Sequence, residues 1–366
     1  MSTLLLAGCG LYVVFVLALL RGLNRLGSPP APPDTLPPVS VVIAARNEQA
    51  HLPALLEALD RQNYSGGEWE CIVVDDRSTD GTGDLLDTWC ESHPRFRALR
   101  ISQPAPNMTP KKWALTQGIE AAGGDIILAT DADCVPPPGW IHSMVSRLLA
   151  GDPPPGIVVG FSRMSDQHPS LLTAYQRVDF LAVMSANAGA IGQGWGWSGS
   201  GQNLAYRKQT FEEIGGFEPV ADRISGDDVY LVQSIAPRAP VAFNADPRSF
   251  MTTQPVTRWK TFLHQHIRWS SNSKHLIATD RRFLLFLVAA FLTNLSLLIG
   301  WIWWDPGTWL LVALVKFLLE MSVLFQGAQR FQTPVVPAVC VLWFLLQPLY
   351  IPITGIGGLI GRYRWK

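Results

Sequence analysis

Two aspartates stand one residue apart where an apolar run ends, in IILATDADCVPPPGW, residues 126–140. Side chains at positions i and i+2 of a strand point the same way, so Asp131 and Asp133 are expected to face each other across Ala132. At roughly 6 Å and an effective dielectric constant of about 20, their repulsion is about 3 kcal/mol. The pair therefore indicates either a bound cation or two carboxylates that are simply solvated at a strand end.

Further acidic side chains follow two other apolar runs, VVIAARNE and VVDDRSTDGT. Ligands of open parallel sheets bind beyond the carboxyl ends of the strands. Glu48, Asp75 and Asp76 are expected at such ends, where a carboxylate can accept a hydrogen bond from a nucleobase or a ribose hydroxyl. The alternative, equally compatible with these residues alone, is that Asp76, Ser78 and Thr79 cap the next helix.

Lys111 and Lys112 open a predicted helix in TPKKWALTQGI. Lysine is unfavourable to the helix dipole at this end but useful beside a phosphate, although a solvated pair is the ordinary alternative. Carboxylate oxygens of the kind that Asp131 and Asp133 offer suit Mg²⁺ or Mn²⁺ bound jointly with a substrate diphosphate. An Asp-x-Asp pattern alone is a weak signal for such a site.

Two later stretches, ISGDDVYL and HQHIRW, strengthen that interpretation. The first places Asp227 and Asp228 after a flexible glycine. The second places Gln265, Arg268 and Trp269 at i, i+3 and i+4, hence on one face of a helix. A guanidinium can bind a diphosphate with two hydrogen bonds, a glutamine can donate to the same oxygens, and an indole can stack on a sugar. The neighbouring His264 and His266 are assigned no role.

The stretch GWGWSGSGQNLAYRK spells the pattern GxGxxG with Gly194, Gly196 and Gly199. A dinucleotide site requires a strand before that pattern and a helix after it, whereas the preceding residues are predicted to be helical. We therefore reject a dinucleotide site. Trp195 and Trp197 fill the gaps of the pattern, and packing inside the fold is one interpretation of them.

These residues must be positioned by a sheet. Apolar strands are predicted at 39–45, 70–76, 96–101 and 125–131, with helices between them at about 48–62, 80–92 and 111–122. Alternating strands and helices with almost continuously apolar strands predict an α/β fold whose mostly parallel sheet carries helices on both faces.

Both ends of the chain are apolar. Residues 3–20 carry no charge and are followed by Arg21 and Arg25, which predicts an uncleaved transmembrane anchor (residues 1–26) with the next segment in the cytoplasm. LAGC at residues 6–9 resembles a lipoprotein cleavage box, but no basic region precedes it, so we reject a signal peptide. A proline-rich linker follows at 27–38.

The C-terminal region, residues 276–366, contains apolar segments at about 283–304, 308–325 and 335–361. Lys316 and Glu320 are four residues apart and are expected to pair against a neighbouring helix. Pro348 and Pro352 interrupt the last segment, which either crosses the bilayer or re-enters it. A crossing would place the basic tail GRYRWK outside, against the positive-inside rule.

Bulk composition excludes several classes of function. The 366 residues include 29 acidic and 29 basic side chains, which argues against a general nucleic-acid-binding protein. The 48% apolar content and 14 tryptophans favour a membrane protein. Five scattered cysteines contain no CxxC pair, so neither a disulfide framework nor a zinc site is expected, and all five are interpreted as reduced.

Taken together, the spaced aspartates and the QxxRW stretch resemble the membrane-bound family 2 glycosyltransferases, the group of the cellulose, hyaluronan and poly-N-acetylglucosamine synthases and the ceramide glucosyltransferases. The resemblance covers about residues 39–275. It implies a GT-A fold, a cytoplasmic glycosyltransferase domain in a multi-pass protein of the cell membrane, and a nucleotide-sugar donor, commonly UDP-linked.

The resemblance also implies roles for individual residues. The nucleoside would contact Glu48 and Asp76 or Asp75, and the donor phosphates would meet Lys111 with Lys112 beside it. Asp131 and Asp133 would hold Mg²⁺ or Mn²⁺, with Asp133 the surer ligand, and Asp228 with its neighbour Asp227 would match the catalytic base. Gln265 and Arg268 would hold the diphosphate, and Trp269 the acceptor sugar or lipid head group. Trp195 and Trp197 would be stacking platforms on the acceptor side, with packing tryptophans as an equal alternative.

The implied reaction is an inverting transfer to a lipid or lipid-linked acceptor. A single addition is favoured because three or four membrane helices look too few for a polysaccharide channel. The acceptor strand, SGSGQNLAYRK at residues 198–208, and the base motif, GDD at residues 226–228, also differ from the residues of the cellulose-type enzymes. The alternative is one subunit of a processive polysaccharide synthase. A more distant alternative is a sensor that binds a nucleotide-sugar without turnover. The presence of both the catalytic base and QxxRW argues against a sensor.

Overall fold

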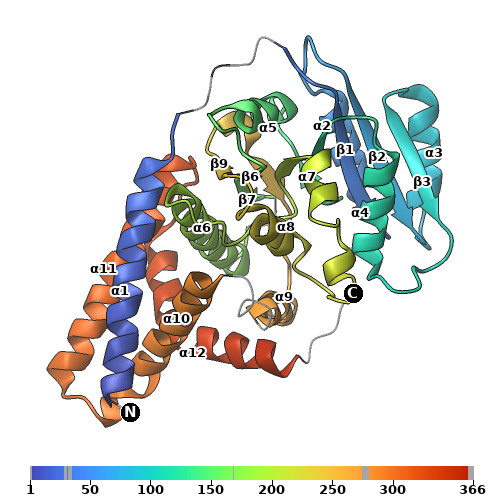
Figure 1. Ribbon diagram of the computed structural model, residues 1–366. Coiled ribbons are helices and arrows are strands. Elements are labelled where there is room, and N and C mark those ends of the chain that lie inside the picture. Colours follow the sequence, from blue (N-terminus) through green and yellow to red (C-terminus); the bar gives the residue numbers. More distant parts are fainter. Residues whose placement is uncertain (1, 29–30, 32–34, 168, 274–279, 362–366) are drawn as a thin grey trace. The chain divides into compact units, whose positions relative to one another are not determined.

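The computed structural model describes residues 2–28, 31, 35–167, 169–273 and 280–361 (Figure 1). The chain forms two units. The sheet unit contains Gly27–Arg163 and Ser198–Gln254, and the helical unit contains Met1–Leu26, Met164–Trp197 and Pro255–Lys366. The predicted domain of residues 39–275 is therefore divided between the two units, and its boundaries stay a prediction.

The first half of the sheet unit alternates strands and helices as predicted. Its elements are β1 (Val39–Ala45), α2 (Leu52–Asp60), β2 (Trp69–Asp76), α3 (Thr82–Ser92), β3 (Phe96–Ile101), α4 (Pro110–Ala121) and β4 (Ile126–Ala129). The four predicted strands and three predicted helices are confirmed, with shifted bounds at several ends. The strands pair in parallel in the order β3-β2-β1-β4.

The second half completes that sheet with antiparallel pairing. The main sheet has the order β3-β2-β1-β4-β8-β6-β9, in which β8 is antiparallel to both of its neighbours, and a small sheet has the order β5-β10-β7. The elements are β5 (Cys134–Val135), α5 (Trp140–Leu149), β6 (Ile157–Gly160), β7 (Ser162–Met164), β8 (Leu204–Arg207), α7 (Lys208–Glu213), η1 (Glu218–Val220), α8 (Asp227–Ile235), β9 (Val241–Asn244), η2 (Pro247–Ser249) and β10 (Met251–Thr253).

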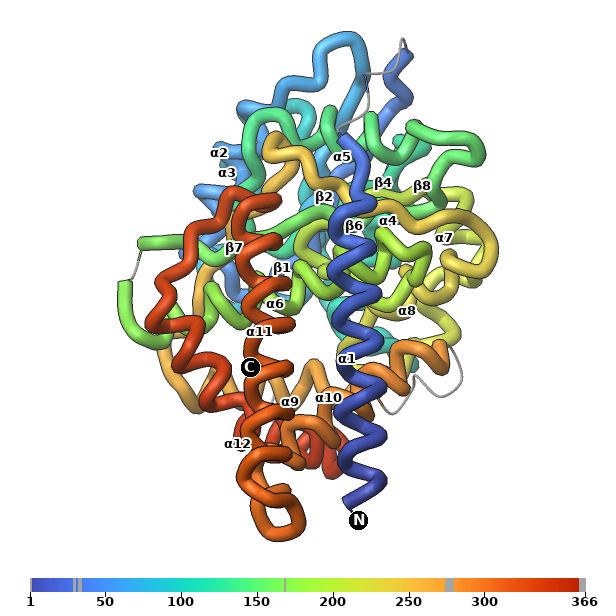
Figure 2. The backbone as a smooth tube through the Cα atoms, turned by 90° about the vertical axis from the view of Figure 1, so that its left-hand side faces the viewer, coloured from blue at the N-terminus to red at the C-terminus, as the bar shows by residue number. Residues whose placement is uncertain are grey.

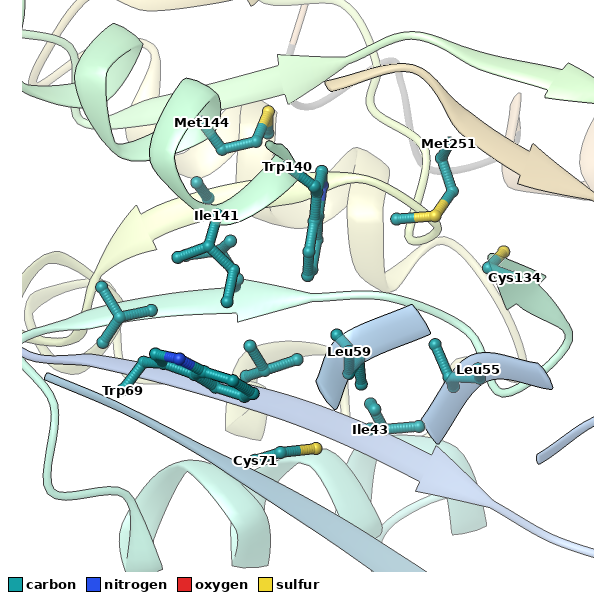
Figure 3. Close-up of a cluster of buried hydrophobic side chains, with 14 of the residues drawn as sticks. Ile43, Leu55, Leu59, Trp69, Cys71, Cys134, Trp140, Ile141, Met144 and Met251 are labelled. Atoms are coloured by element: carbon teal, nitrogen blue, oxygen red, sulfur yellow. The ribbon is translucent and has the colours of Figure 1, made fainter. Parts of the chain in front are cut away.

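Alternate residues of β1 and β2 serve the two faces of the sheet. Val42 and Val74 face α4, where Gly118 comes so near that an added Cβ would lie 2.5 Å from Val42. Ile43 and Cys71 instead belong to the apolar core shared with α2 and α5, which Figure 3 shows around Trp140. Because successive strand side chains point to opposite faces of the sheet, an uninterrupted apolar strand can bury side chains on both faces.

The helical unit gathers segments that are far apart in sequence. It contains α1 (Ser2–Arg25), α6 (Leu171–Gly192), α9 (Trp259–Ser271), α10 (Arg281–Ile299, continued by η4, Gly300–Ile302), α11 (Pro306–Arg330) and α12 (Pro337–Ile360). Helix α1 contacts α6, α10 and α11, and α9 contacts α12 (Figure 2). Four of these helices, α1, α10 with η4, α11 and α12, are long and apolar enough to cross a membrane.

The last apolar segment is a helix that includes both Pro348 and Pro352. Its length allows a crossing, while the choice between crossing and re-entry stays a prediction. Most of the basic tail, residues 362–366, and part of the proline-rich linker, residues 29–30 and 32–34, lie outside the described residues.

Polar contacts join three of the apolar helices. Lys316 of α11 donates to Glu320 Oε2 at 2.8 Å, which confirms the expected pair. Tyr12 of α1 donates to Glu320 Oε1 at 2.6 Å, and Gln347 of α12 donates to Glu320 Oε2 at 3.0 Å. Since these groups are buried and hydrogen-bonded to one another, the network fixes how α1, α11 and α12 pack.

Candidate active site

Strand order changes direction between β1 and β4, because β2 and β3 follow on one side of β1 and β4 lies on the other. Loops that leave the carboxyl ends of two such strands diverge and open a crevice in which α/β proteins bind ligands. Glu48 follows β1, and Asp131 and Asp133 follow β4. The acidic residues singled out from the sequence therefore lie at the end of the sheet where ligand binding is expected.

Asp131 and Asp133 do not lie on a strand, which corrects the first expectation. Strand β4 ends at Ala129, and the next residues form a turn closed by a hydrogen bond from Cys134 N to the Asp131 carbonyl at 3.2 Å. The alternation of strand side chains therefore does not apply to this pair. Its charges still interact, since burial, followed by the charges of Asp131 and Glu48, raises the pKa of Asp133 to about 6.

Lys111 joins these carboxylates to a second acidic pair. Its Nζ lies 2.7 Å from Asp131 Oδ1 and 3.7 Å from Asp227 Oδ2. Burial alone would lower the pKa of the Lys111 ammonium, but the charges of Asp131 and Asp227 outweigh it and raise that pKa. The Lys111 ammonium group thus joins the first turn of α4 to the turn after β4 and to the start of α8.

Asp228 occupies the first turn of α8, after Gly226 with φ +84°. Its Oδ2 accepts a hydrogen bond from Gly201 N at 3.1 Å, and its Oδ1 accepts one from Val229 N at 2.8 Å. Burial, and next the charge of Asp227, raise the pKa of Asp228 to about 6. A carboxylate with a pKa near neutrality is suited to general-base catalysis.

Asp75 and Asp76 lie at the buried end of β2. Asp76 pairs with Arg77 Nε at 2.7 Å and with Arg46 at 3.8 Å, and Asp75 Oδ1 accepts from Ser78 N at 3.1 Å. The alternative that Asp76, Ser78 and Thr79 cap the next helix is wrong, because α3 begins at Thr82 and has no side-chain cap at its N-cap residue.

The loops after β1 and β2 are joined by Asn47, to which the sequence analysis assigned no role. Asn47 Oδ1 accepts from Thr79 N at 2.7 Å, and Asn47 N donates to Ser78 Oγ at 2.9 Å. Asn47 and Arg77 both have positive φ, 56° and 55°, a conformation that costs of order 1–3 kcal/mol outside glycine and recurs at ligand sites. The motifs RNE and DDRS contain both residues, but nothing in the sequence marks their backbone angles.

Two other neighbours of the predicted residues bear on the site. His51 Nδ1 lies 2.7 Å from Glu48 Oε2, so this carboxylate has a partner that the sequence did not indicate. Lys112 is 1% exposed, donates to the Arg223 carbonyl, and has its pKa lowered by burial. Because its ammonium group is used inside the fold, we leave Lys112 out of the proposed donor site.

The remaining predicted residues lie in the helical unit. Gln265, Arg268 and Trp269 are partly exposed on α9, while His266 between them is buried. Trp197 is 2% exposed and stacks on Phe283 and on Phe286, each with ring centroids 5.2 Å apart.

These stacking contacts favour the packing alternative for Trp197. Trp195 is less buried, and its ring lies 5.7 Å from the Arg282 guanidinium carbon. The GxGxxG pattern follows helix α6 and precedes strand β8, which is the reverse of a dinucleotide site.

Within the described residues, no three His, Cys, Asp or Glu side chains are grouped to hold a metal ion by themselves. Asp131 and Asp133 offer hard oxygen ligands, and burial, followed by the charges of Asp131 and Glu48, disfavours an uncompensated carboxylate at Asp133 by raising its pKa. A divalent cation that takes two protein carboxylates and completes its coordination with phosphate oxygens fits this donor set.

Comparison with known proteins agrees with the geometry. Residues 40–215 match the profile of Glycosyl transferase family 2. The probable glycosyltransferase YdaM of Bacillus subtilis is 28% identical over 246 residues, 66% of this chain and 56% of that protein. Beta-monoglucosyldiacylglycerol synthase of Nostoc sp. is 33% identical over 130 residues, 33% of this chain and 27% of that protein. The chain thus spans little more than half of YdaM and about a quarter of the synthase.

A solved structure resembles nearly the whole chain. The mannosyltransferase PcManGT from Pyrobaculum calidifontis, in complex with GDP-Man and Mn²⁺, has a TM-score of 0.60 at 20% identity and covers 98% of this chain and 97% of its own. The expected fold, a GT-A type sheet with apolar helices at both ends, is confirmed by this similarity.

Proposed function

This chain carries a glycosyl transferase family 2 domain, and from that premise we propose that it transfers a sugar from a nucleotide-sugar to a lipid or lipid-linked acceptor at the membrane, inverting the anomeric centre. The observation that carries the proposal is the position of Lys111, 2.7 Å from Asp131 and 3.7 Å from Asp227, with Asp228 next along α8. The Lys111 ammonium group, surrounded by carboxylates at the carboxyl end of the sheet, fits a site that binds a diphosphate and carries out a proton transfer.

Donor binding is assigned to the loops after β1, β2 and β4. Glu48, Asp75 and Asp76 would accept hydrogen bonds from the nucleoside, and Asp131 and Asp133 would hold Mg²⁺ or Mn²⁺. Such a cation, when bound, neutralises negative charge on the leaving diphosphate. From the sequence motif alone we retain the proposal that Gln265 and Arg268 bind the diphosphate and that Trp269 binds the acceptor.

The reaction is a single displacement. Asp228 accepts the proton of the acceptor hydroxyl while the oxygen of that hydroxyl forms a bond to the anomeric carbon. The bond from that carbon to the diphosphate oxygen breaks, and its electron pair leaves with the nucleotide. Lys111 stabilises the charge that develops there.

A lipid acceptor is favoured by two observations. The described part of the chain contains four helices that could span a bilayer, and the Nostoc relative is named for the synthesis of a glucosylated diacylglycerol. We place the sheet unit on the cytoplasmic side because Arg21 and Arg25 follow the first apolar helix. The PcManGT structure supports testing GDP-linked as well as UDP-linked donors.

The test is release of nucleotide diphosphate by the purified full chain from a panel of UDP- and GDP-sugars, with and without Mn²⁺ and membrane lipids. Wild-type enzyme is expected to release nucleotide from at least one donor, and Asp228→Asn to lose turnover while still binding the nucleotide. Mass spectrometry of the lipid product separates one added sugar from a polymer. Folded protein that binds a donor but never releases nucleotide would be a sensor instead.

A further inference from the structure

We propose that His266, the residue inside QHIRW that the reaction does not use, is a positioning residue: as an imidazolium paired with Asp179, it holds the face of α9 that carries Gln265, Arg268 and Trp269. The inference rests on the proposed function, because those three side chains act on donor and acceptor only if that function is correct. The pairing itself is a property of the helical unit and can be tested without turnover.

Both ring nitrogens of His266 face hydrogen-bond acceptors. Nδ1 lies 2.9 Å from the Phe262 carbonyl oxygen, and Nε2 lies 2.9 Å from Asp179 Oδ2. A carbonyl oxygen can only accept, so Nδ1 carries a proton, and a carboxylate requires a second proton on Nε2. Asp179 Oδ1 also accepts a hydrogen bond from Trp343 Nε1 at 2.8 Å. The two contacts together fit an imidazolium ring.

Three helices meet at this pair. His266 belongs to α9, Asp179 to α6 and Trp343 to α12, so the carboxylate of Asp179 joins α9 to both neighbours. Asp179 and His266 are 6% and 9% exposed. Water competes little at such a place, which makes these charged hydrogen bonds strong and their loss costly.

The ring also supports the residue proposed to bind the acceptor. Trp269 meets His266 edge-on with ring centroids 4.5 Å apart, and Phe262 lies on another side at 4.2 Å. Among the described residues, titratable groups with ring contacts around the pair include Tyr350 of α12, 5.4 Å from the ring, and Tyr175 of α6, which contacts Phe262. Both are phenols, which stay neutral at moderate pH, so Asp179 supplies the counter-charge.

Loss of the Nε2 proton at alkaline pH would set a lone pair against the Asp179 carboxylate. The tie between α9 and α6 would then be lost, and the three QxxRW side chains would be less well held. A charged hydrogen bond is equivalent to roughly tenfold in an equilibrium constant. We therefore expect the KM for the donor to rise roughly tenfold with pH, before kcat falls.

The first experiment is ¹⁵N NMR of histidine side chains in the full chain, held in nanodiscs at neutral pH. The His266 signals, identified by their loss in His266→Gln, are expected to show two protonated nitrogens. In Asp179→Asn, whose amide can donate to Nε2 and accept from Trp343, His266 is expected to be neutral. One unprotonated His266 nitrogen in the wild-type protein would overturn the proposal, whatever the enzyme's activity.

The second experiment compares donor KM against pH. In His266→Gln, the glutamine amide can donate a hydrogen bond to Asp179 at every pH. The KM of this variant for the nucleotide-sugar should therefore not rise at alkaline pH. His264→Gln, the same change two residues earlier on α9, serves as the matched control and should behave like the wild type. The proposal is overturned if His266→Gln shows the full wild-type rise. If no donor is turned over at all, the proposed function fails, while the NMR result still decides the state of His266.

Discussion

Lys111 of α4 and Asp131 of the turn after β4 form an ion pair of 2.7 Å, with both side chains about one-third exposed (33% and 31%). An ion pair so open to water contributes little to folding stability. Its position, with Asp227 3.7 Å from the same ammonium group, indicates that the charge serves the site instead.

Removing the Lys111 charge should alter the pH dependence of activity. Lys111 lowers the pKa of both Asp133 and Asp228, so Lys111→Met should raise these pKa values above about 6. The acidic limb of the kcat/KM profile is then expected to move to higher pH, together with a loss of activity. Lys111→Arg keeps the charge and should keep the limb near its wild-type position. An unmoved limb in Lys111→Met would contradict the electrostatic role.

Asp228→Asn should lower kcat by roughly 10²–10⁴-fold, the usual contribution of a general base. It should also affect stability in a pH-dependent way. The pKa of Asp228 is raised from 3.8 to about 6 in the folded protein, so the folded state holds the proton more tightly than the unfolded one, and the stability that this group contributes falls as the pH rises through that interval.

The asparagine variant avoids that loss. In thermal unfolding, the stability of Asp228→Asn relative to the wild type is expected to increase from about pH 4 to about pH 7. Asp84→Asn, which changes an acidic residue in the first turn of α3, is the control and should show a smaller gain. Equal differences between Asp228→Asn and wild type at both pH values would argue against the raised pKa.

Metal and nucleotide should stabilise the protein jointly. Because only two protein carboxylates are assigned to the cation, Mn²⁺ alone should raise the melting temperature little, and Mn²⁺ with UDP or GDP should raise it more. At a ligand concentration a hundredfold above its Kd the stabilisation is about 2.7 kcal/mol. Asp131→Asn and Asp133→Asn should each reduce the joint shift, and removal of Mn²⁺ by EDTA should reverse it. A full shift with Mn²⁺ alone would point to a complete metal site.

Trp197 should affect stability more than catalysis. Its indole is 2% exposed and stacks on Phe283 and Phe286, so Trp197→Ala is expected to cost about 3–5 kcal/mol of stability. Trp197→Phe retains a stacking ring and should remain active. If Trp197→Ala kept its melting temperature and lost only acceptor affinity, the stacking-platform interpretation would be correct after all.

Local pattern was sufficient for much of this protein. The strands of residues 39–45 and 96–101 have the predicted bounds, because apolar runs of that length between turns and helices have few other conformations. The apolar terminal helices were equally clear, since a run of about twenty apolar residues is enough to predict a membrane-spanning helix. Spacing also placed Gln265, Arg268 and Trp269 on one helix, a local property of the 3.6-residue repeat.

Tertiary structure decided which of the chemically capable residues meet. Lys111 and Lys112 are adjacent and look equivalent in sequence, yet consecutive helical side chains point about 100° apart, so Lys111 faces the aspartates and Lys112 the Arg223 carbonyl. His266 pairs with Asp179, 87 positions away, and nothing near QHIRW indicates that partner. Residue types and local periodicity are written along the chain, whereas contacts between distant side chains depend on how helices and strands pack.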